Sequence, residues 1–434
     1  MNIYRVLRTL SAHGYGQAIS IASTLIIPAA IIAKWGALDF GYWVSLSALA
    51  QFFLMSDLGA ATALANQLCL KSTRSDVDAW TLIQAVNLYV IKKIGVSIGI
   101  IIPTSLLIGF YNSHAQLDAH AFQLAVIFFC LALSITIQPV ITVYCAVWRF
   151  EGKNEVGIFI ANTVRLLESC IVVVTATLNG TLYAAAIYAL IFKIVALSVM
   201  AYIMRQHALK HDINHTAVPD KNTLSELNLI VKAGHGFSLI SLSQQLTLQG
   251  PVLLISTLAG PVAAAVFAAC RTLSRVPNQP LNVLLASIGP ELTDLISNQK
   301  LAELRNITKK IAVIIMMMST TISTVAILNI ATVEEIWLSG KLALDIKILI
   351  PLCIAGTLNL SSQVINQALT AANRTHIQSR QFIIASFLLI CIMYPTLAFT
   401  KQPMLCGILI FFSEGIMTIL LFKQFTLFSS ELKK

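Results

Sequence analysis

The fold is decided by residues 235–294, which read HGFSLISLSQQLTLQGPVLLISTLAGPVAAAVFAACRTLSRVPNQPLNVLLASIGPELTD. This pattern predicts two apolar helices joined by a short turn. The first contains Gly250 and Pro251, and a proline inside a spanning helix interrupts its hydrogen-bond ladder and bends it. The second carries Arg271 and Arg275, one helical turn apart. Because a guanidinium at membrane depth costs several kcal/mol on insertion scales, such residues indicate a function.

A weaker copy of this stretch lies near the N-terminus. Three features recur 222, 223 and 224 residues apart, namely His13 and His235, Pro28 and Pro251, and Gly36 and Gly260. Matches at nearly one spacing predict a duplicated half, as in many transporters.

The composition places most of the chain in lipid. Of 434 residues, 57% are hydrophobic and 11% are charged, and the mean hydropathy is +0.80. A soluble chain carries roughly 25% charged residues. A spanning helix needs about 20 apolar residues, and this chain supplies about twelve such segments. We therefore predict an all-α polytopic membrane protein.

The expected helices form two bundles of six, and their approximate ranges can be written from the apolar runs. They are 13–35, 40–68, 83–110, 122–148, 156–178, one from the turn at 179–180 to about 204, two within 235–294, and then 311–331, 346–372, 382–399 and 404–425. We predict an N-terminal bundle at 1–204, a cytoplasmic linker loop at 205–228 and a C-terminal bundle at 229–434.

The net charge of +10 follows the loops and does not indicate nucleic acid. Lysine and arginine gather in the loops after even-numbered helices, so the positive-inside rule predicts that both termini are cytoplasmic. Two halves of six helices then share one orientation and relate by a pseudo-twofold axis along the membrane normal. Such halves leave a cleft that can open alternately to either side.

Four cations lie deep in the predicted helices, namely Arg165, Lys193, Arg271 and Arg275. In one interpretation they line a cationic cleft that binds phosphate, because guanidinium forks match phosphate oxygens. Arg271 and Arg275 share a helix face, so two forks could hold one diphosphate. In the other interpretation the cations pair internally, Arg165 with Glu168 and Lys193 with Glu414.

Other residues leave two interpretations open. Asp57 either couples transport to an ion or accepts hydrogen bonds from a helix end. Glu168 and Glu414 are likewise candidates for ion coupling or for a structural role. Pro28 and the Gly250-Pro251 pair are candidates for bends that open and close a lateral gap. The eight cysteines show no CxxC pair and no His/Cys ligand spacing, which indicates packed thiols and predicts no metal or cofactor.

Three features, in their order along the chain, resemble those of a known family. They are residues 52–68 (FFLMSDLGAATALANQL), residues 250–290 with G-P, R-x-L and a late Pro-Glu, and the two six-helix halves. The chain resembles the polysaccharide-exporter branch of the multidrug/oligosaccharidyl-lipid/polysaccharide (MOP) superfamily, and within it the Wzx-type O-antigen flippases. The resemblance implies a bacterial inner-membrane protein of lipopolysaccharide biosynthesis. Its substrate would be an undecaprenyl-diphosphate-linked oligosaccharide, moved from the cytoplasmic to the periplasmic leaflet.

The same resemblance implies coupling to an H⁺ or Na⁺ gradient and contact with a polysaccharide polymerase and chain-length regulator. Three alternatives stay open. A drug/cation antiporter of the same superfamily needs deep acids, and the deep charges here are mostly basic. A flippase for the lipid-linked peptidoglycan precursor usually carries additional helices. An O-antigen polymerase or ligase usually carries a large periplasmic loop, and we find no catalytic triad, phosphate loop or metal signature.

Overall fold

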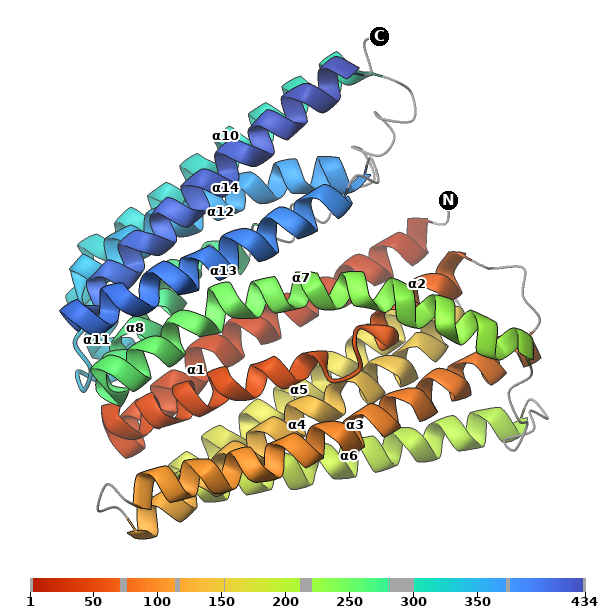
Figure 1. Ribbon diagram of the computed structural model, residues 1–434, viewed down its shortest axis with the longest axis horizontal. Helices are drawn as coiled ribbons and strands as arrows, with labels where there is room; N and C mark the ends of the chain where they lie inside the picture. Colours follow the sequence, from red (N-terminus) through yellow and green to blue (C-terminus); the bar gives the residue numbers. More distant parts are fainter. Residues whose placement is uncertain are drawn as a thin grey trace. The chain divides into compact units, whose positions relative to one another are not determined.

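The protein is described by a computed structural model covering residues 3–70, 76–113, 118–151, 153–210, 221–279, 281, 300–371 and 375–431. Within these residues the chain is mostly helical and contains no strand (Figure 1). The elements are α1 (Ile3–Ala50), η1 (Gln51–Met55), α2 (Ala60–Leu70), α3 (Asp76–Ser113), α4 (Asp118–Phe150), α5 (Asn154–Thr177), α6 (Leu182–Lys210), α7 (Lys221–Ala259), α8 (Pro261–Ser274), α10 (Leu301–Leu328), α11 (Ile330–Leu338), α12 (Ile346–Ala371), α13 (Thr375–Thr400) and α14 (Pro403–Glu431).

The outer surfaces of these helices confirm a membrane environment. Among the described residues, nine helices are long and apolar enough to cross a bilayer. Large apolar side chains face outward, for example Leu106 at 68% exposure and Phe122 at 71%. A soluble protein rarely exposes contiguous apolar surface on this scale, because its contact with water is unfavourable. The prediction of an all-α multi-pass membrane protein is confirmed.

The described chain divides into two compact units. Unit 1 comprises Met1–Ile19 and Leu46–Leu242. Its centre is α4, which packs against α2, α3, α5 and α6. In the most apolar 18-residue segment of α4, 61% of the residues are buried, against 17% in the corresponding segments of α3 and of α5. The outer helices therefore show most of their surface to lipid, and α4 forms the core.

Unit 2 comprises Ser20–Ser45 and Ser243–Lys434. Its centre is α12, which packs against α8, α10 and α14, while α13 packs on α14. The most apolar window of α12 is also 61% buried. Each unit is thus built around one buried helix, which is where a polar side chain is most protected from lipid.

Helices α6 and α7 extend into the two ends of the predicted linker. Helix α6 extends to Lys210 and α7 begins at Lys221, so most of the predicted loop at 205–228 is helical or lies outside the described residues, as 211–220 do. Polar residues continue these helices because a helix satisfies its own backbone beyond the hydrocarbon. Helices α1 and α7 are each divided between the two compact units, because residues 20–45 and the residues from 243 onward belong to unit 2. The halves predicted at 1–204 and 229–434 instead follow chain order. That chain-order division stays a prediction.

Two glycines of the predicted repeat adopt the same unusual backbone conformation. Gly36 has φ 90° and ψ 179°, and Gly260 has φ 94° and ψ 165°. A positive φ of this size favours glycine, because a side chain would clash with the backbone. Each glycine marks the break before the second helix of its repeat, with Gly36 breaking α1 and Gly260 preceding α8. The shared conformation supports the duplication proposed from spacing.

Candidate functional site

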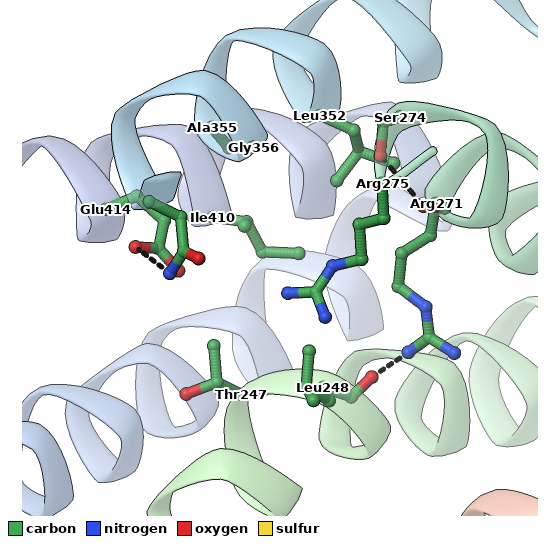
Figure 2. A pocket seen from close by; sticks show the side chains of 11 residues that line it. Thr247, Leu248, Arg271, Ser274, Arg275, Leu352, Ala355, Gly356, Ile410 and Glu414 are labelled. Carbon is green, nitrogen blue, oxygen red and sulfur yellow. Dashed lines mark hydrogen bonds between the residues drawn. The ribbon is translucent and has the colours of Figure 1, made fainter. Parts of the chain in front are cut away.

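Unit 2 contains a pocket lined by four helices (Figure 2). Helix α7 contributes Thr247 and Leu248, and Arg275 follows directly after the end of α8. The complete lining is Thr247, Leu248, Arg271, Ser274, Arg275, Leu352, Ala355, Gly356, Asn359, Ile410 and Glu414. The two arginines singled out in the sequence therefore line one pocket.

Close packing of α8 on α12 shapes this pocket. A Cβ atom built on Gly356 would lie 3.0 Å from the carbonyl oxygen of Ser274. A glycine at this position of α12 therefore lets the end of α8 approach without being displaced. The approach places Arg271 and Arg275 beside the buried face of α12.

The Arg275 side chain extends into the pocket. Figure 2 shows it reaching into the space between Glu414 and Leu248. Within the described residues its guanidinium makes no ion pair within 4.0 Å. Arg275 is thus a cation whose fork of five N–H donors faces the cavity.

Arg271 turns in another direction. Its Nη1 donates a hydrogen bond to the backbone carbonyl of Leu248 on α7. The sequence predicted that the forks of Arg271 and Arg275 together could hold one diphosphate. The structure brings both residues to one pocket, with Arg271 engaged by the backbone of α7.

One carboxylate shares this pocket. Glu414 on α14 is 9% exposed, and its Oε2 accepts a hydrogen bond of 3.0 Å from Asn359 Nδ2. Gln363 Nε2 donates to Asn359 Oδ1 at 2.8 Å, which fixes the orientation of the Asn359 amide. The lining therefore carries two guanidinium groups and one carboxylate, so cationic charge prevails.

A second polar cluster lies inside unit 1. Lys193 Nζ lies 3.1 Å from Glu168 Oε2, and Ser134 donates to Glu168 Oε1 at 2.8 Å. The Lys193 side chain is only 6% exposed. Three helices, α4, α5 and α6, thus place their polar side chains together in the interior of this unit.

Neither pair of the alternative interpretation, in which the cations pair internally, is found among the described residues. Lys193 pairs with Glu168 and not with Glu414, because α5 and α6 are packed neighbours in unit 1. Arg165 is exposed and makes no ion pair with another described residue. Proximity along the helix favoured Arg165 as the partner of Glu168, but the neighbouring helix supplies the cation instead.

Asp57 lies in the turn between η1 and α2, three residues before α2 begins, and it is 4% exposed. Its Oδ1 accepts the backbone N–H of Gly59 at 3.0 Å, and its Oδ2 accepts that of Ala61 at 2.8 Å. The first turn of a helix leaves such N–H groups without partners. Of the two interpretations of Asp57, this geometry describes the structural one.

Sequence reasoning missed several polar residues of these clusters, among them Asn359 and Ser134. A signal for Asn359 was present, because residues 358–367 (LNLSSQVINQ) are unusually polar for a spanning helix. Ser134 carried no such signal, because serines that bond their own helix backbone are common in membrane helices.

Comparison with solved structures finds the same fold among transporters of the MOP superfamily. An inward-facing multidrug resistance MATE family transporter is 15% identical, with a TM-score of 0.69, covering 98% of this chain and 95% of that one. A MOP superfamily transporter from Pyrococcus furiosus, described by the reverse polarity of its binding pocket, is 16% identical, with a TM-score of 0.65, covering 99% and 96%. An outward-facing MATE family transporter is 14% identical, with a TM-score of 0.64 and coverage of 99% and 96%.

Comparison with protein-family models and with curated proteins finds no match. The likeness in structure, at such low identity, shows the fold. The chain is therefore a multi-pass membrane protein with the two-half helical fold of MOP-type transporters.

Proposed function

We propose that this protein is a flippase that moves an undecaprenyl-diphosphate-linked oligosaccharide from the cytoplasmic to the periplasmic leaflet by alternating access. The observation that carries the proposal is the unit 2 pocket, in which Arg275 extends into a cavity also lined by Arg271. The proposal places the protein in a bacterial inner membrane with both termini cytoplasmic. An H⁺ or Na⁺ gradient would drive it, and a polysaccharide polymerase and chain-length regulator would act beside it.

The chemistry of the substrate requires such a pocket. A diphosphate cannot cross hydrocarbon unaided, because removing water from its charges is very costly. Guanidinium groups in a dry pocket replace that hydration with charge-assisted hydrogen bonds. The prenyl chain needs no such site, because it is as apolar as the lipid around it.

A drug/cation antiporter is the second candidate, and Glu414 is the residue that favours it. A buried carboxylate could hold a cationic drug, and the MATE family neighbours are described as multidrug resistance transporters. Two arginines in the same lining would repel that cation. The reverse pocket polarity described for the Pyrococcus furiosus neighbour indicates that this fold can host pockets of either charge. The enzyme alternatives, an O-antigen polymerase or ligase, gain no support from the pocket.

Binding of a defined lipid tests the proposal. The purified protein in nanodiscs would be titrated with undecaprenyl diphosphate, with undecaprenol as the uncharged probe and a lipophilic cation as the drug-like probe. We expect tight binding of the diphosphate alone. Arg275→Ala should weaken it about 10- to 100-fold, because a hydrogen bond between charged groups contributes about 1.5–3 kcal/mol.

The matched control is Arg305→Ala, which removes an exposed arginine of α10 in the same unit. It should keep the affinity of the wild-type protein. In cells deleted for the gene, the double variant Arg271→Ala with Arg275→Ala should abolish surface polysaccharide at unchanged protein level. Binding of the cation in preference to the diphosphate, or unchanged affinity in Arg275→Ala, would contradict the proposal.

A further inference from the structure

The two proline-interrupted helices share a feature that spacing alone did not show. In α7 the carbonyl of Leu248, three residues before Pro251, accepts a hydrogen bond from Arg271 Nη1. In α1 the carbonyl of Leu25, three residues before Pro28, accepts a hydrogen bond of 2.7 Å from Trp337 Nε1. The two acceptors stand at the same offset from the two prolines of the predicted repeat.

A third hydrogen bond lies at the same offset, three residues before a glycine that interrupts α1. Lys341 Nζ donates to the carbonyl of Ala33, three residues before Gly36, whose backbone is non-helical. Trp337 lies on α11, and Lys341 lies in the turn after it. All donors and acceptors of these three hydrogen bonds belong to unit 2.

The physical reason lies in the helix ladder. Proline has no N–H for the carbonyl four residues before it, and its ring bends the helix at that point, so the hydrogen bond to the neighbouring carbonyl, three residues before the proline, opens or weakens as well. In lipid no water replaces the missing donor, and an unsatisfied backbone group is costly. Donors from other helices must therefore satisfy these carbonyls. Arg, Lys and Trp suit this role, because their side chains donate hydrogen bonds and accept none.

We propose that Arg271 and Trp337 are positioning residues for transport, each holding a proline-interrupted helix in shape by bonding the carbonyl three residues before its proline. Arg275 then serves as the anion ligand, and Arg271 sets the position of α7 at the pocket wall. The role in transport rests on the proposed function. The hydrogen-bonded support of α1 and α7 stands whichever substrate the pocket takes.

A double-mutant cycle tests this support without any substrate. Pro251→Ala restores the N–H that the Thr247 carbonyl lacks and removes the bend that opens the hydrogen bond of the Leu248 carbonyl. Pro28→Ala does the same for Thr24 and Leu25 in α1. Arg271→Gln should lower the midpoint of thermal unfolding in nanodiscs in the wild-type background and leave it nearly unchanged in Pro251→Ala. Trp337→Phe, which keeps an aromatic ring and removes the donor, should show the same pattern with Pro28→Ala.

The crossed combinations are the matched controls. Arg271→Gln in Pro28→Ala, and Trp337→Phe in Pro251→Ala, should keep their full effect, because each donor serves only its own helix. Arg271→Lys should recover most of the midpoint, since an ammonium can also donate to Leu248. Equal shifts from Arg271→Gln in the wild-type and Pro251→Ala backgrounds would overturn the proposal.

A functional measurement separates positioning from anion binding. Arg271→Gln should lose less of the affinity for undecaprenyl diphosphate than Arg275→Ala does, because the Arg271 guanidinium bonds the backbone of α7, and it should lose surface polysaccharide. The positioning role would be overturned, and Arg271 assigned to the anion, by three results together. Arg271→Gln would lose as much affinity as Arg275→Ala, Arg271→Lys would keep full transport, and the thermal cycle would show no coupling between Arg271 and Pro251. If the wild-type protein binds no diphosphate, the proposed function fails while the thermal cycle still decides the support of α7.

Discussion

At the scale of single residues, the stability lost on breaking the ion pair inside unit 1 depends on whether one partner or both are replaced. Lys193 is nearly fully buried, and its ammonium lies 3.1 Å from Glu168. Lys193→Met should leave an unpaired carboxylate in apolar surroundings, which destabilises by about 3 kcal/mol. Lys193→Met with Glu168→Gln should recover most of this loss, because an amide carries no charge. Thermal unfolding in detergent measures both, and equal midpoints for the single and double variants would argue against a coupled pair.

Two glycines of unit 2 lie against different kinds of atoms, one against backbone and the other against the end of a side chain. A Cβ atom on Gly41 would overlap the backbone carbonyl of Pro261, whereas one on Gly250 would overlap the Cδ1 atom of the Ile390 side chain. A backbone cannot yield as a side-chain end can. We therefore expect Gly41→Ala to lower the unfolding midpoint more than Gly250→Ala, whose overpacking should cost about 1–3 kcal/mol.

A second substitution checks the cause of the Gly250 effect. Ile390→Val shortens the overlapping side chain and should restore part of the stability of Gly250→Ala. The same Ile390→Val change should give no benefit to Gly41→Ala. Recovery in both backgrounds would show that the effect is not local to α7 and α13.

At the scale of elements, Asp57 decides how α2 begins. Its two carboxylate oxygens each accept one backbone N–H, from Gly59 and Ala61. Asp57→Ala should destabilise by about 0.5–2 kcal/mol, as loss of an N-cap does. Asp57→Asn keeps one acceptor oxygen and should lose less. Unfolding midpoints of the three proteins measure this order.

The alternative interpretation of Asp57 makes a different prediction for transport. A capping residue leaves the ion dependence of transport unchanged in Asp57→Asn, whereas a coupling residue loses it. Surface polysaccharide production in Asp57→Asn cells would be followed with and without a protonophore or a sodium ionophore. Transport that no longer responds to either ionophore, in a variant of normal stability, would assign coupling to Asp57.

At the scale of the whole molecule, the charge pattern predicts the side of each turn. Helix α5 (Asn154–Thr177) is about 36 Å long at about 1.5 Å per residue, enough to cross about 30 Å of hydrocarbon. Lys153 at its start should therefore face the cytoplasm, and Asn179 after its end should face the opposite side. Single cysteines at Lys153 and Asn179, labelled with a membrane-impermeant thiol reagent in whole cells, measure this. Labelling of the Lys153→Cys variant, without labelling of Asn179→Cys, would show that the orientation is opposite to the predicted one.

The helices could be predicted because lipid, unlike a folded core, requires long apolar runs. The expected segment 122–148 lies within α4 (Asp118–Phe150), and 404–425 lies within α14 (Pro403–Glu431). The observed helices are longer, since polar residues outside the hydrocarbon continue the same hydrogen-bond ladder. The expected segments 13–35 and 40–68 were less accurate. They are replaced by α1, η1 and α2, with the break of α1 at Gly36.

By itself the sequence determined the all-α membrane class, the repeat spacing and the importance of Arg271 and Arg275, because charge and proline are rare and costly in lipid. Only the tertiary structure decided which groups those residues meet. Lys193 bonds Glu168, Arg271 bonds the Leu248 carbonyl, and Glu414 shares a pocket with Arg275. The physical reason is that hydropathy depends on each residue alone, whereas a hydrogen bond depends on which helix face packs against which neighbour.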